Sequence, residues 1–461
     1  MKKTLLLLLL TLLSATASNA EDFTYTYEGQ TLTYTVINGS KRTCETKGSS
    51  TYSDCHSISG SLTIPSSADG YTVTAIGQSS FQYCKDLTEL TIPTSVSSIN
   101  GYAFRCCTGL TSVTLPVSSI GEMAFAGCSG LTSVTFTESL KYINAHAFVA
   151  CSGLTTVYIP KSCTLVSQCA FGNCERLLSI EVDPENKSYA SSDGVLFKKD
   201  FTTLVQCPAG KEGDYIIPES VSTIYYNAFT NSALTSISIP ETVTTIEDYA
   251  FRDCQNLISI SIPESVNYID EYTFYNCTGL TSIDLPKGLE EIGNHAFENC
   301  SGLTSVSIPE TVTTIANFAF QNCSGLTSIS IPESMRSIHT ATFNGCTNLT
   351  EIQCFMQEPC KAYGSSFDSK TYEKATLYVP TGTVSLYQAT TPWNLFKNIT
   401  DEPLLSGIED VVADGVDAID YTQPYEVYNL QGALVGQSTD GLAAGVYIVR
   451  QGEKSAKVAI R

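Results

Sequence analysis

The stretch Ile292-Gly-Asn-His-Ala-Phe-Glu-Asn-Cys-Ser-Gly-Leu-Thr-Ser-Val-Ser-Ile-Pro309 decides the fold, because its pattern returns every 23 residues. Neighbouring copies carry phenylalanine at the same place, at positions 251, 274, 297, 320 and 343. Each of these phenylalanines has isoleucine five residues before it, cysteine three residues after it and leucine six residues after it. A fixed period in the twenties indicates a solenoid, in which each repeat adds one strand and one turn to a stack.

The leucine-containing part of each repeat predicts a short parallel strand. In Leu303–Ile308, alternation with a period of two buries Val306 and Ile308 and turns Ser305 and Ser307 outward. The proline that follows ends the strand without removing a ladder hydrogen bond. We therefore expect a repeat solenoid of leucine-rich repeats of about 23 residues with parallel β-strands, together with a small C-terminal β-sandwich.

The repeats also predict the domain organisation. They extend over residues 76–402 as one array, with an irregular segment near 183–216 that has the pattern of an inserted β-hairpin. Residues 21–75 alternate polar and apolar side chains and are expected to form an N-terminal β cap over the first apolar face. Residues 403–422 form an acidic linker in this interpretation, and residues 423–461 predict four short strands joined by glycine-containing turns.

The N-terminus and the charge limit the classes of partner. Residues 1–20 have the basic start, apolar run and small residues of a secretory signal peptide. The net charge is −21, and it becomes −23 once Lys2 and Lys3 leave with that peptide. So acidic a chain opposes nucleic acid and anionic lipid and favours cationic or neutral partners. Because no other stretch approaches about 18 apolar residues, we expect no transmembrane helix in the mature protein.

Eighteen cysteines in an exported chain would ordinarily predict disulfides. Equivalent residues of a parallel stack lie about 4.8 Å apart, however, whereas a disulfide brings Cβ atoms to about 3.8 Å. We therefore expect a buried column of free thiols, three residues after each phenylalanine. This thiol column comprises Cys84, Cys107, Cys128, Cys151, Cys174, Cys254, Cys277, Cys300, Cys323 and Cys346. Better disulfide candidates are Cys44 with Cys55 and Cys354 with Cys360, and there is no C-x-x-C pair to support zinc.

The residue before each column cysteine carries a backbone signal. It is asparagine at 173, 276, 299 and 322 and glycine at 127 and 345. These residue types are expected where the backbone needs a positive φ.

The chain offers little catalytic chemistry. Two of its four histidines, His146 and His295, occupy the same repeat position, which favours a structural role. Glutamates follow several of the strand-ending prolines, and they form either a calcium site or, more simply, a solvated negative edge. This glutamate column is Glu219, Glu241, Glu264, Glu310 and Glu333. We expect no catalytic residue, no cofactor and no metal site.

The outward strand positions form the broadest repeated surface, which is flat, rich in hydroxyl groups and nearly uncharged. It either binds an extended protein or glycan through many weak hydrogen bonds, or carries the residues that any solvated parallel face tolerates, and the sequence leaves both open. The candidate ligand-binding residues are Thr114, Thr135, Tyr158, Ser238, Ser261, Asp284, Ser307 and Ser330.

Two resemblances add to this interpretation. The pattern Ile-Gly-x-x-Ala-Phe-x-x-Cys-x-x-Leu-Thr-Ser-Val-x-Ile-Pro at 292–309, repeated with small changes at 315–332, resembles the BspA-like leucine-rich repeats of bacterial surface proteins. That resemblance implies adhesion to host matrix proteins or to other cells. The tail Val427-Tyr-Asn-Leu-Gln-Gly432 with Gly441-Leu-Ala-Ala-Gly-Val-Tyr-Ile-Val449 resembles the C-terminal sorting domain of type IX secretion in Bacteroidota. It implies recognition by the secretion machinery and export across the outer membrane.

We therefore expect a secreted protein without enzymatic activity, displayed at the outer membrane surface or released outside the cell. Its expected partner is a host or bacterial surface protein or glycan. Two alternatives remain, an envelope enzyme that processes glycans and a structural surface-coat protein.

Overall fold

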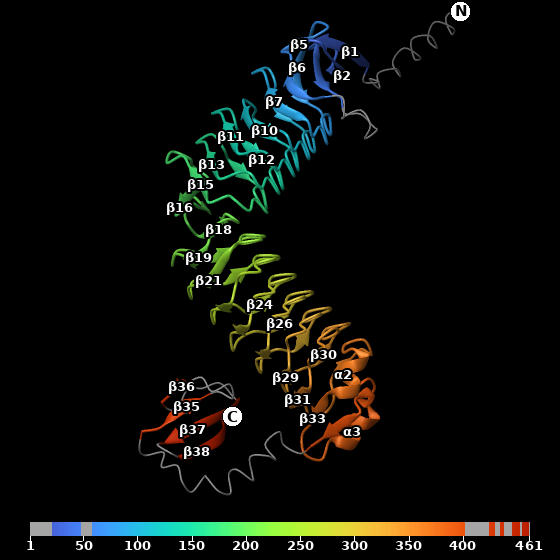
Figure 1. Cartoon of the computed structure of the whole chain (residues 1–461), viewed down its shortest axis with the longest axis vertical. Coiled ribbons are helices and arrows are strands. Elements are labelled where there is room, and N and C mark those ends of the chain that lie inside the picture. Colours follow the sequence, from blue (N-terminus) through green and yellow to red (C-terminus); the bar gives the residue numbers. More distant parts are fainter. Residues whose placement is uncertain are drawn as a thin grey trace, which may run out of the picture.

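The computed structural model describes residues 21–47, 58–401, 424–428, 434–437, 445–451 and 454–460. It is an elongated stack of turns in which consecutive repeats lie side by side, from the blue N-terminal end to the orange C-terminal end (Figure 1). The repeat solenoid that the period predicts is therefore confirmed. The expected signal peptide, residues 1–20, lies outside the described residues.

The longer strand of each repeat lies on one side of the stack, which we call the long-strand face. Neighbouring strands pair in parallel and in register, so that Val134 lies opposite Val113. Within each strand the apolar residues are buried and the residues between them face outward, as Ser305, Val306 and Ser307 illustrate. The strands of this face are β4 (Gly60–Thr63), β7 (Leu87–Thr91), β9 (Ser112–Leu115), β11 (Ser133–Phe136), β13 (Thr156–Ile159), β15 (Ser179–Val182), β19 (Gly213–Ile216), β21 (Leu234–Ser238), β23 (Ser259–Ser261), β25 (Ser282–Asp284), β27 (Ser305–Ser307), β29 (Ser328–Ile331), β31 (Glu351–Cys354), β33 (Thr376–Tyr378) and β34 (Asn398–Thr400).

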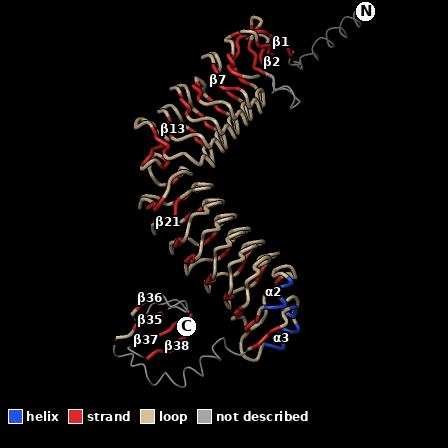
Figure 2. Tube along the Cα trace, in the orientation of Figure 1, coloured by secondary structure: helices blue, strands red, loops and turns tan. Residues whose placement is uncertain are grey.

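The opposite side of the stack, the short-strand face, holds a two-residue strand from each repeat. These strands also pair in parallel, and most of them end in a buried isoleucine, as β26 and β28 do in Ile292 and Ile315. Figure 2 shows that loops and turns make up most of each described repeat. The short strands are β8 (Ser98–Ile99), β10 (Ser119–Ile120), β12 (Tyr142–Ile143), β14 (Leu165–Val166), β20 (Thr223–Ile224), β22 (Thr245–Ile246), β24 (Tyr268–Ile269), β26 (Glu291–Ile292), β28 (Thr314–Ile315), β30 (Ser337–Ile338) and β32 (Lys361–Ala362).

The repeat phenylalanines stack inside the solenoid in a column. Phe125 and Phe148 lie 5.2 Å apart between ring centroids with their planes 2° from parallel, and the other neighbours in the column are similar. The alanine before the ring is fully buried in most repeats, as Ala296 is. Its small side chain leaves room for the neighbouring ring.

The turns beside the column use left-handed backbone at two positions. The residue before the column cysteine has a positive φ, for example 63° at Asn299, 59° at Asn322 and 70° at Gly127, which confirms the prediction. A second positive φ occurs two residues before the phenylalanine, as at His146 with 58° and Phe318 with 61°. The sequence did not predict this second position, because it rarely carries asparagine and never glycine.

The N-terminal end is closed by antiparallel strands. β1 (Asp22–Tyr27), β2 (Gln30–Asn38) and β3 (Thr43–Thr46) pair in that order, and β3 then pairs in parallel with β6 (Tyr71–Ile76). β5 (Ser67–Ala68) forms a hairpin with β6. Because β6 in turn pairs with β8, the capping strands continue the sheet of the short-strand face. The parallel pairing of the long-strand face starts at β4, which lies beside β7.

Three antiparallel strands interrupt the array within the irregular segment. We call β16 (Tyr189–Ser192), β17 (Val195–Lys198) and β18 (Thr203–Gln206) the joint, and β18 resumes the parallel stack by pairing with β20. Figure 1 shows the stack changing direction in this green region, between β15 and β19.

The joint packs against two separate hydrophobic cores. Val195, Phe197 and Leu204 belong to the core of the C-terminal half, whereas Leu196 and Val205 belong to the core of the N-terminal half. Neighbouring residues of one strand point to opposite sides of a sheet, so both sides of the joint are apolar and both are covered.

The C-terminal end of the array is closed by two short helices and a 3₁₀ turn, α2 (Ser369–Lys374), α3 (Val384–Ala389) and η2 (Trp393–Leu395). The indole Nε1 of Trp393 donates a hydrogen bond to the carbonyl oxygen of Cys360, 2.9 Å away. Cys354 and Cys360 are both free in this structure, so the disulfide that we considered between them is not formed.

The remaining cysteine pair that we considered is only partly described. Cys44 is a buried free thiol, and its candidate partner Cys55 lies outside the described residues.

The four strands that the tail predicts form one antiparallel sheet. They are β35 (Glu426–Tyr428), β36 (Leu434–Gly436), β37 (Gly445–Gln451) and β38 (Lys454–Ile460), in the order β36-β35-β37-β38. Val427 and Val449 are buried together in this sheet.

Candidate functional site

The long-strand face carries hydroxyl groups in register across neighbouring repeats. Thr114 lies opposite Thr135, and Ser307 lies opposite Ser330 on the next strand. Parallel pairing forces this alignment, because residues at one repeat position stack directly above one another. The face therefore presents columns of hydrogen-bonding groups along the length of the solenoid.

The predicted ligand-binding residues all lie on this face, in two groups separated by the joint. Thr114, Thr135 and Tyr158 belong to the N-terminal half, and the remaining five belong to the C-terminal half. Seven of the eight are exposed, and Ser330 is half-buried. The C-terminal group comprises Ser238, Ser261, Asp284, Ser307 and Ser330.

Tyr158 is held by a contact that the sequence did not indicate. Its hydroxyl donates a hydrogen bond to the Asp183 carboxylate, 2.9 Å away, and this bond raises the pKa of Tyr158. Asp183 also accepts the backbone N–H of Glu185, which is the main reason that the pKa of Asp183 is lowered, followed by Tyr158. The loop that leads into the joint therefore fixes the orientation of a ring on the candidate face.

Threonines line the start of the long strands and tie the repeats together. The hydroxyl of Thr132 donates to the carbonyl oxygen of Thr111 at 3.0 Å, and that of Thr281 donates to the carbonyl oxygen of Ile258 at 3.2 Å. The same bond is made by Thr88, Thr235, Thr304, Thr327 and Thr350. We call this repeat position the threonine column.

Two members of the threonine column are apolar, Leu178 and Ile258, and both are exposed. A third exposed apolar residue, Ile216, lies opposite Ser238 in the outward column of the face. The sequence analysis did not single out these residues. A signal was present, because Leu177-Leu178-Ser179 and Leu257-Ile258-Ser259 depart from the Leu-Thr-Ser triplet of other repeats.

The thiol column is buried and free, and its thiols donate hydrogen bonds. Each of nine column cysteines contacts the carbonyl oxygen of a phenylalanine on an adjacent turn, for example Cys151 with Phe125 at 3.1 Å. Burial raises the pKa of the Cys174 thiol to about 12. A thiol held in this protonated form is a poor nucleophile.

The two repeat histidines differ in their surroundings. His295 stacks between Tyr272 and Phe318, with ring centroids 4.4 Å and 4.7 Å away, and its Nδ1 contacts the Glu298 carboxylate. The Nδ1 of His146 is buried and has no hydrogen-bond partner. Recurrence at one repeat position favours a structural role for both, and ring stacking adds support for His295.

The glutamate column binds backbone. The Glu264 carboxylate accepts the N–H of Lys287 at 2.9 Å, and the Glu241 carboxylate accepts the N–H of Glu264 at 3.2 Å. These two bonds link neighbouring repeats at Glu241 and Glu264. In the part of the chain that the structure describes, no group of three or more His, Cys, Asp or Glu side chains is arranged to hold a metal ion.

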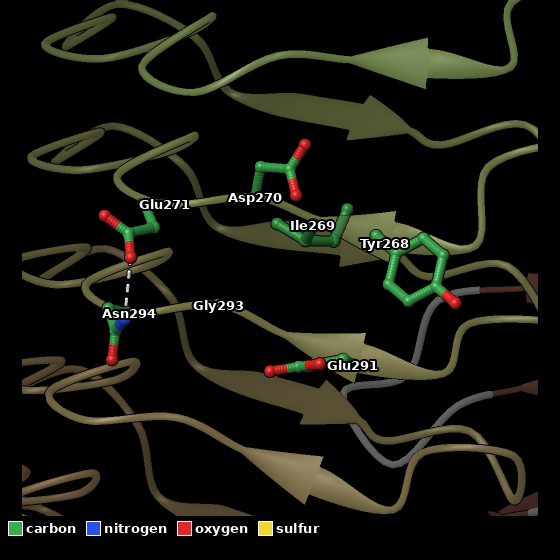
Figure 3. Close-up of a pocket in the computed structure, with 7 residues that line it drawn as sticks. All are labelled: Tyr268, Ile269, Asp270, Glu271, Glu291, Gly293 and Asn294. Atoms are coloured by element: carbon green, nitrogen blue, oxygen red, sulfur yellow. Dashed lines mark hydrogen bonds between the residues drawn. The ribbon is translucent and has the colours of Figure 1, made fainter.

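A shallow cavity of about 160 Å³ lies on the short-strand side, between the repeats of β24 and β26. Figure 3 shows Tyr268, Asp270 and Glu291 around it, with Glu271 accepting a hydrogen bond from Asn294 at 2.8 Å. Burial, and then the neighbouring carboxylates, raise the pKa of Asp270. The cavity offers negative charge and hydrogen-bond acceptors to a ligand.

Among the described residues there is no helix with the length and apolar character that crossing a membrane requires.

Comparison with known proteins identifies a family with the same repeats. The family model described as the BspA type leucine rich repeat region matches the chain in six copies, over residues 45–178, 213–323 and 269–388. A search of curated proteins gives no match.

Solved structures share the fold. A leucine-rich repeat protein from Eubacterium ventriosum is 24% identical, and the match covers 72% of this chain and 90% of that one with a TM-score of 0.54. The pneumococcal vaccine antigen PcpA is 19% identical over 82% of this chain and 96% of its own, with a TM-score of 0.57. A leucine rich cell surface protein from Faecalibacterium prausnitzii is 24% identical over 73% and 96%, with a TM-score of 0.51.

Proposed function

Because the chain belongs to the BspA-type leucine-rich repeat proteins, we propose that it is a binding protein. In this proposal it has no catalytic activity and is displayed at the cell surface as an adhesin. The proposed partner is a protein or glycan on the surface of a host cell or of another bacterium. The proposed binding site is the long-strand face.

One observation carries the proposal, the register of exposed polar side chains along this face. Ser261 lies opposite Asp284, and Ser328 lies opposite Ser305 on one side and Glu351 on the other. A partner that lies along the solenoid meets the same pair of positions at every strand, so weak hydrogen bonds add up along its length. The strands keep these groups in fixed positions, which lowers the entropy lost on binding.

Display outside the cell is the second part of the proposal. It is supported by the signal peptide expected at residues 1–20 and by the resemblance of residues 423–461 to a type IX secretion sorting domain. Two proteins of the same fold are described as a vaccine antigen and as a cell surface protein. In this proposal the tail binds the secretion machinery, and the solenoid meets the partner.

A binding panel tests the function. The mature chain would be immobilised and exposed to extracellular matrix proteins and mucin glycoproteins, with affinity measured by surface plasmon resonance. We expect saturable binding to at least one of them. A panel in which nothing saturates would refute adhesion and favour the surface-coat alternative, whereas turnover of a glycan would favour the enzyme.

A pair of charge-matched variants locates the site. Ser261→Lys adds a cation to the exposed long-strand face, and Thr245→Lys adds the same charge to an exposed position of the short-strand face. We expect affinity to change strongly in the first variant and little in the second. Equal effects would place the site elsewhere.

A further inference from the structure

The most exposed large hydrophobic side chains of the described chain all lie on the long-strand face beside the joint. The exposed fraction is 76% for Ile216, 58% for Leu178 and 54% for Ile258. Leu178 directly precedes β15, the last long strand before the joint, and Ile216 ends β19, the first long strand after it. Ile258 directly precedes β23, two strands further on.

These side chains contribute nothing to the core of the solenoid. The neighbouring residues Leu177, Ile217 and Leu257 point inward and are buried to within 1% of their surface. Since successive strand residues point to opposite sides, the exposed residue at each place is free to take the hydroxyl-bearing side chain found elsewhere on the face.

Leu178 and Ile258 also lack the side-chain hydrogen bond that threonine makes to the neighbouring repeat at the same position. At the threonine column the hydroxyl donates to the carbonyl oxygen of the preceding turn, as Thr304 does to Thr281 at 3.4 Å. Leu178 and Ile258 keep only the backbone bond, from their N–H groups to Thr155 and Thr235 respectively. An exposed apolar side chain in place of a hydrogen-bonding one gains something only when another molecule covers it.

The charge around these residues selects the partner. Asp214 is the outward residue before Ile216 on β19, and Glu181 occupies the outward position on β15. Glu89, Asp284 and Glu351 add negative charge along the same face. In the described part of the chain, the strands of the long-strand face contain neither lysine nor arginine.

We propose that Leu178, Ile216 and Ile258 anchor an extended segment of a partner protein that alternates apolar and basic side chains, laid across the joint. This inference rests on the proposed function and deepens it, because it names the kind of partner and the place where it binds. The apolar side chains of the segment cover the three anchors, and its basic side chains face Glu181 and Asp214. Interfaces with a few buried apolar anchors inside a polar rim are the arrangement in which most binding energy comes from a few contacts.

The test uses the mature chain and labelled peptides as probes. The first probe alternates lysine and leucine, the second alternates lysine and serine, and the third alternates glutamate and leucine. Binding would be measured by fluorescence anisotropy. We expect the lysine–leucine peptide to bind at least about tenfold more tightly than either of the others.

Two triple variants localise the binding. The variant with Leu178→Thr, Ile216→Ser and Ile258→Thr restores the repeat pattern, so it should keep the melting temperature of the parent. We expect it to lose about tenfold or more in affinity for the lysine–leucine peptide. The control variant removes the same number of exposed apolar side chains from the short-strand face, through Tyr142→Thr, Leu165→Thr and Tyr268→Thr, and should bind as the parent does.

Each outcome decides. Equal affinities of the two triple variants would overturn the inference, and so would equal binding of the leucine and serine peptides or preference for the glutamate peptide. Sedimentation of the unliganded chain adds one more arm, because a dimer that the first triple variant abolishes would make the occupant a second copy and not a basic segment. If the peptide experiments fail but the panel of matrix proteins and mucins still yields a partner, the proposed function stands. If that panel yields no partner, the proposed function is refuted independently of the peptide experiments.

Discussion

The thiol of Cys300 donates a hydrogen bond to the backbone carbonyl oxygen of Phe274, 3.1 Å away in the neighbouring repeat. The same bond links Cys277 to Phe251 and Cys323 to Phe297. We expected a buried column of free thiols, and the structure adds that these thiols donate hydrogen bonds. Each thiol supplies a second hydrogen bond to its carbonyl oxygen, which also accepts a backbone N–H, as the oxygen of Phe274 does from Cys277 at 3.2 Å.

Two substitutions of Cys300 separate the contribution of the thiol hydrogen bond from that of the side-chain volume. Cys300→Ala removes one of the two hydrogen bonds that the carbonyl oxygen of Phe274 accepts, while the backbone N–H of Cys277 remains, so it should lower the free energy of unfolding by about 0.5–1.5 kcal/mol. Cys300→Ser keeps a donor and should cost less, as the buried Ser232 at the equivalent position suggests. Urea unfolding of the two variants and the parent gives the comparison. If the alanine variant is as stable as the serine variant, the bond does not contribute.

Thiol labelling reports the state of the column. Burial raises the pKa of Cys174 to about 12, well above its ordinary value, so the reactive thiolate is suppressed at neutral pH in the folded chain. We expect column thiols to stay unlabelled by a maleimide until denaturant is added, and then to react fully. Mass spectrometry would identify the labelled positions, and native disulfides within the column would contradict the prediction. The half-buried Cys106 serves as an internal comparison, since it should label first.

A glycine substitution tests the left-handed position before the column cysteine. Ala150 occupies this position with φ of 58°, where a Cβ atom is unfavourable. Ala150→Gly should therefore raise the free energy of unfolding by up to about 1 kcal/mol. The matched control is Ala147→Gly in the same turn, which removes a buried methyl group without relieving a positive φ and should destabilise. Thermal unfolding of both variants checks the opposite signs.

The acidic cavity predicts a stability that depends on pH. Burial, and then Asp248, Glu247, Glu291 and Glu271, raise the pKa of Asp270 above the ordinary value of 3.8. The folded chain therefore binds this proton more tightly than the unfolded chain does, so its contribution is favourable at low pH and is lost as the pH rises through the folded pKa. Asp270→Asn should raise the melting temperature at pH 7 relative to the parent and should have little effect near pH 3. An equal effect at both pH values would contradict this cause.

Much of the fold can be predicted from the period. Ile292, Phe297 and Cys300 recur at fixed spacing, and each repeat position has one environment, so burial and strand register follow directly. The residue type of Asn299 likewise predicts a positive φ. The positive φ of His146 and Phe318 cannot be predicted from their residue types, because the turns stacked on either side impose the left-handed backbone there.

The candidate face can be predicted in its regular part only. Alternation in the strands places Thr114 and Ser307 outward. The bond between Tyr158 and Asp183 depends on how the joint folds back onto the neighbouring repeat, which no local pattern specifies. Leu178 breaks the pattern visibly, yet its exposure becomes meaningful only when the positions of Ile216 and Ile258 on the same face are known.

The joint, finally, makes the solenoid two cooperative units in series. Within each half, a repeat is stabilised by its neighbours, and loss of one repeat spreads along the stack. The joint is a sheet whose two sides belong to different cores, with Leu196 in one and Phe197 in the other. Unfolding that spreads along one half therefore stops at this sheet. We predict that calorimetry resolves two transitions, and that a destabilising change such as Phe297→Ala lowers only one of them. A single transition would show that the joint transmits unfolding from one half to the other.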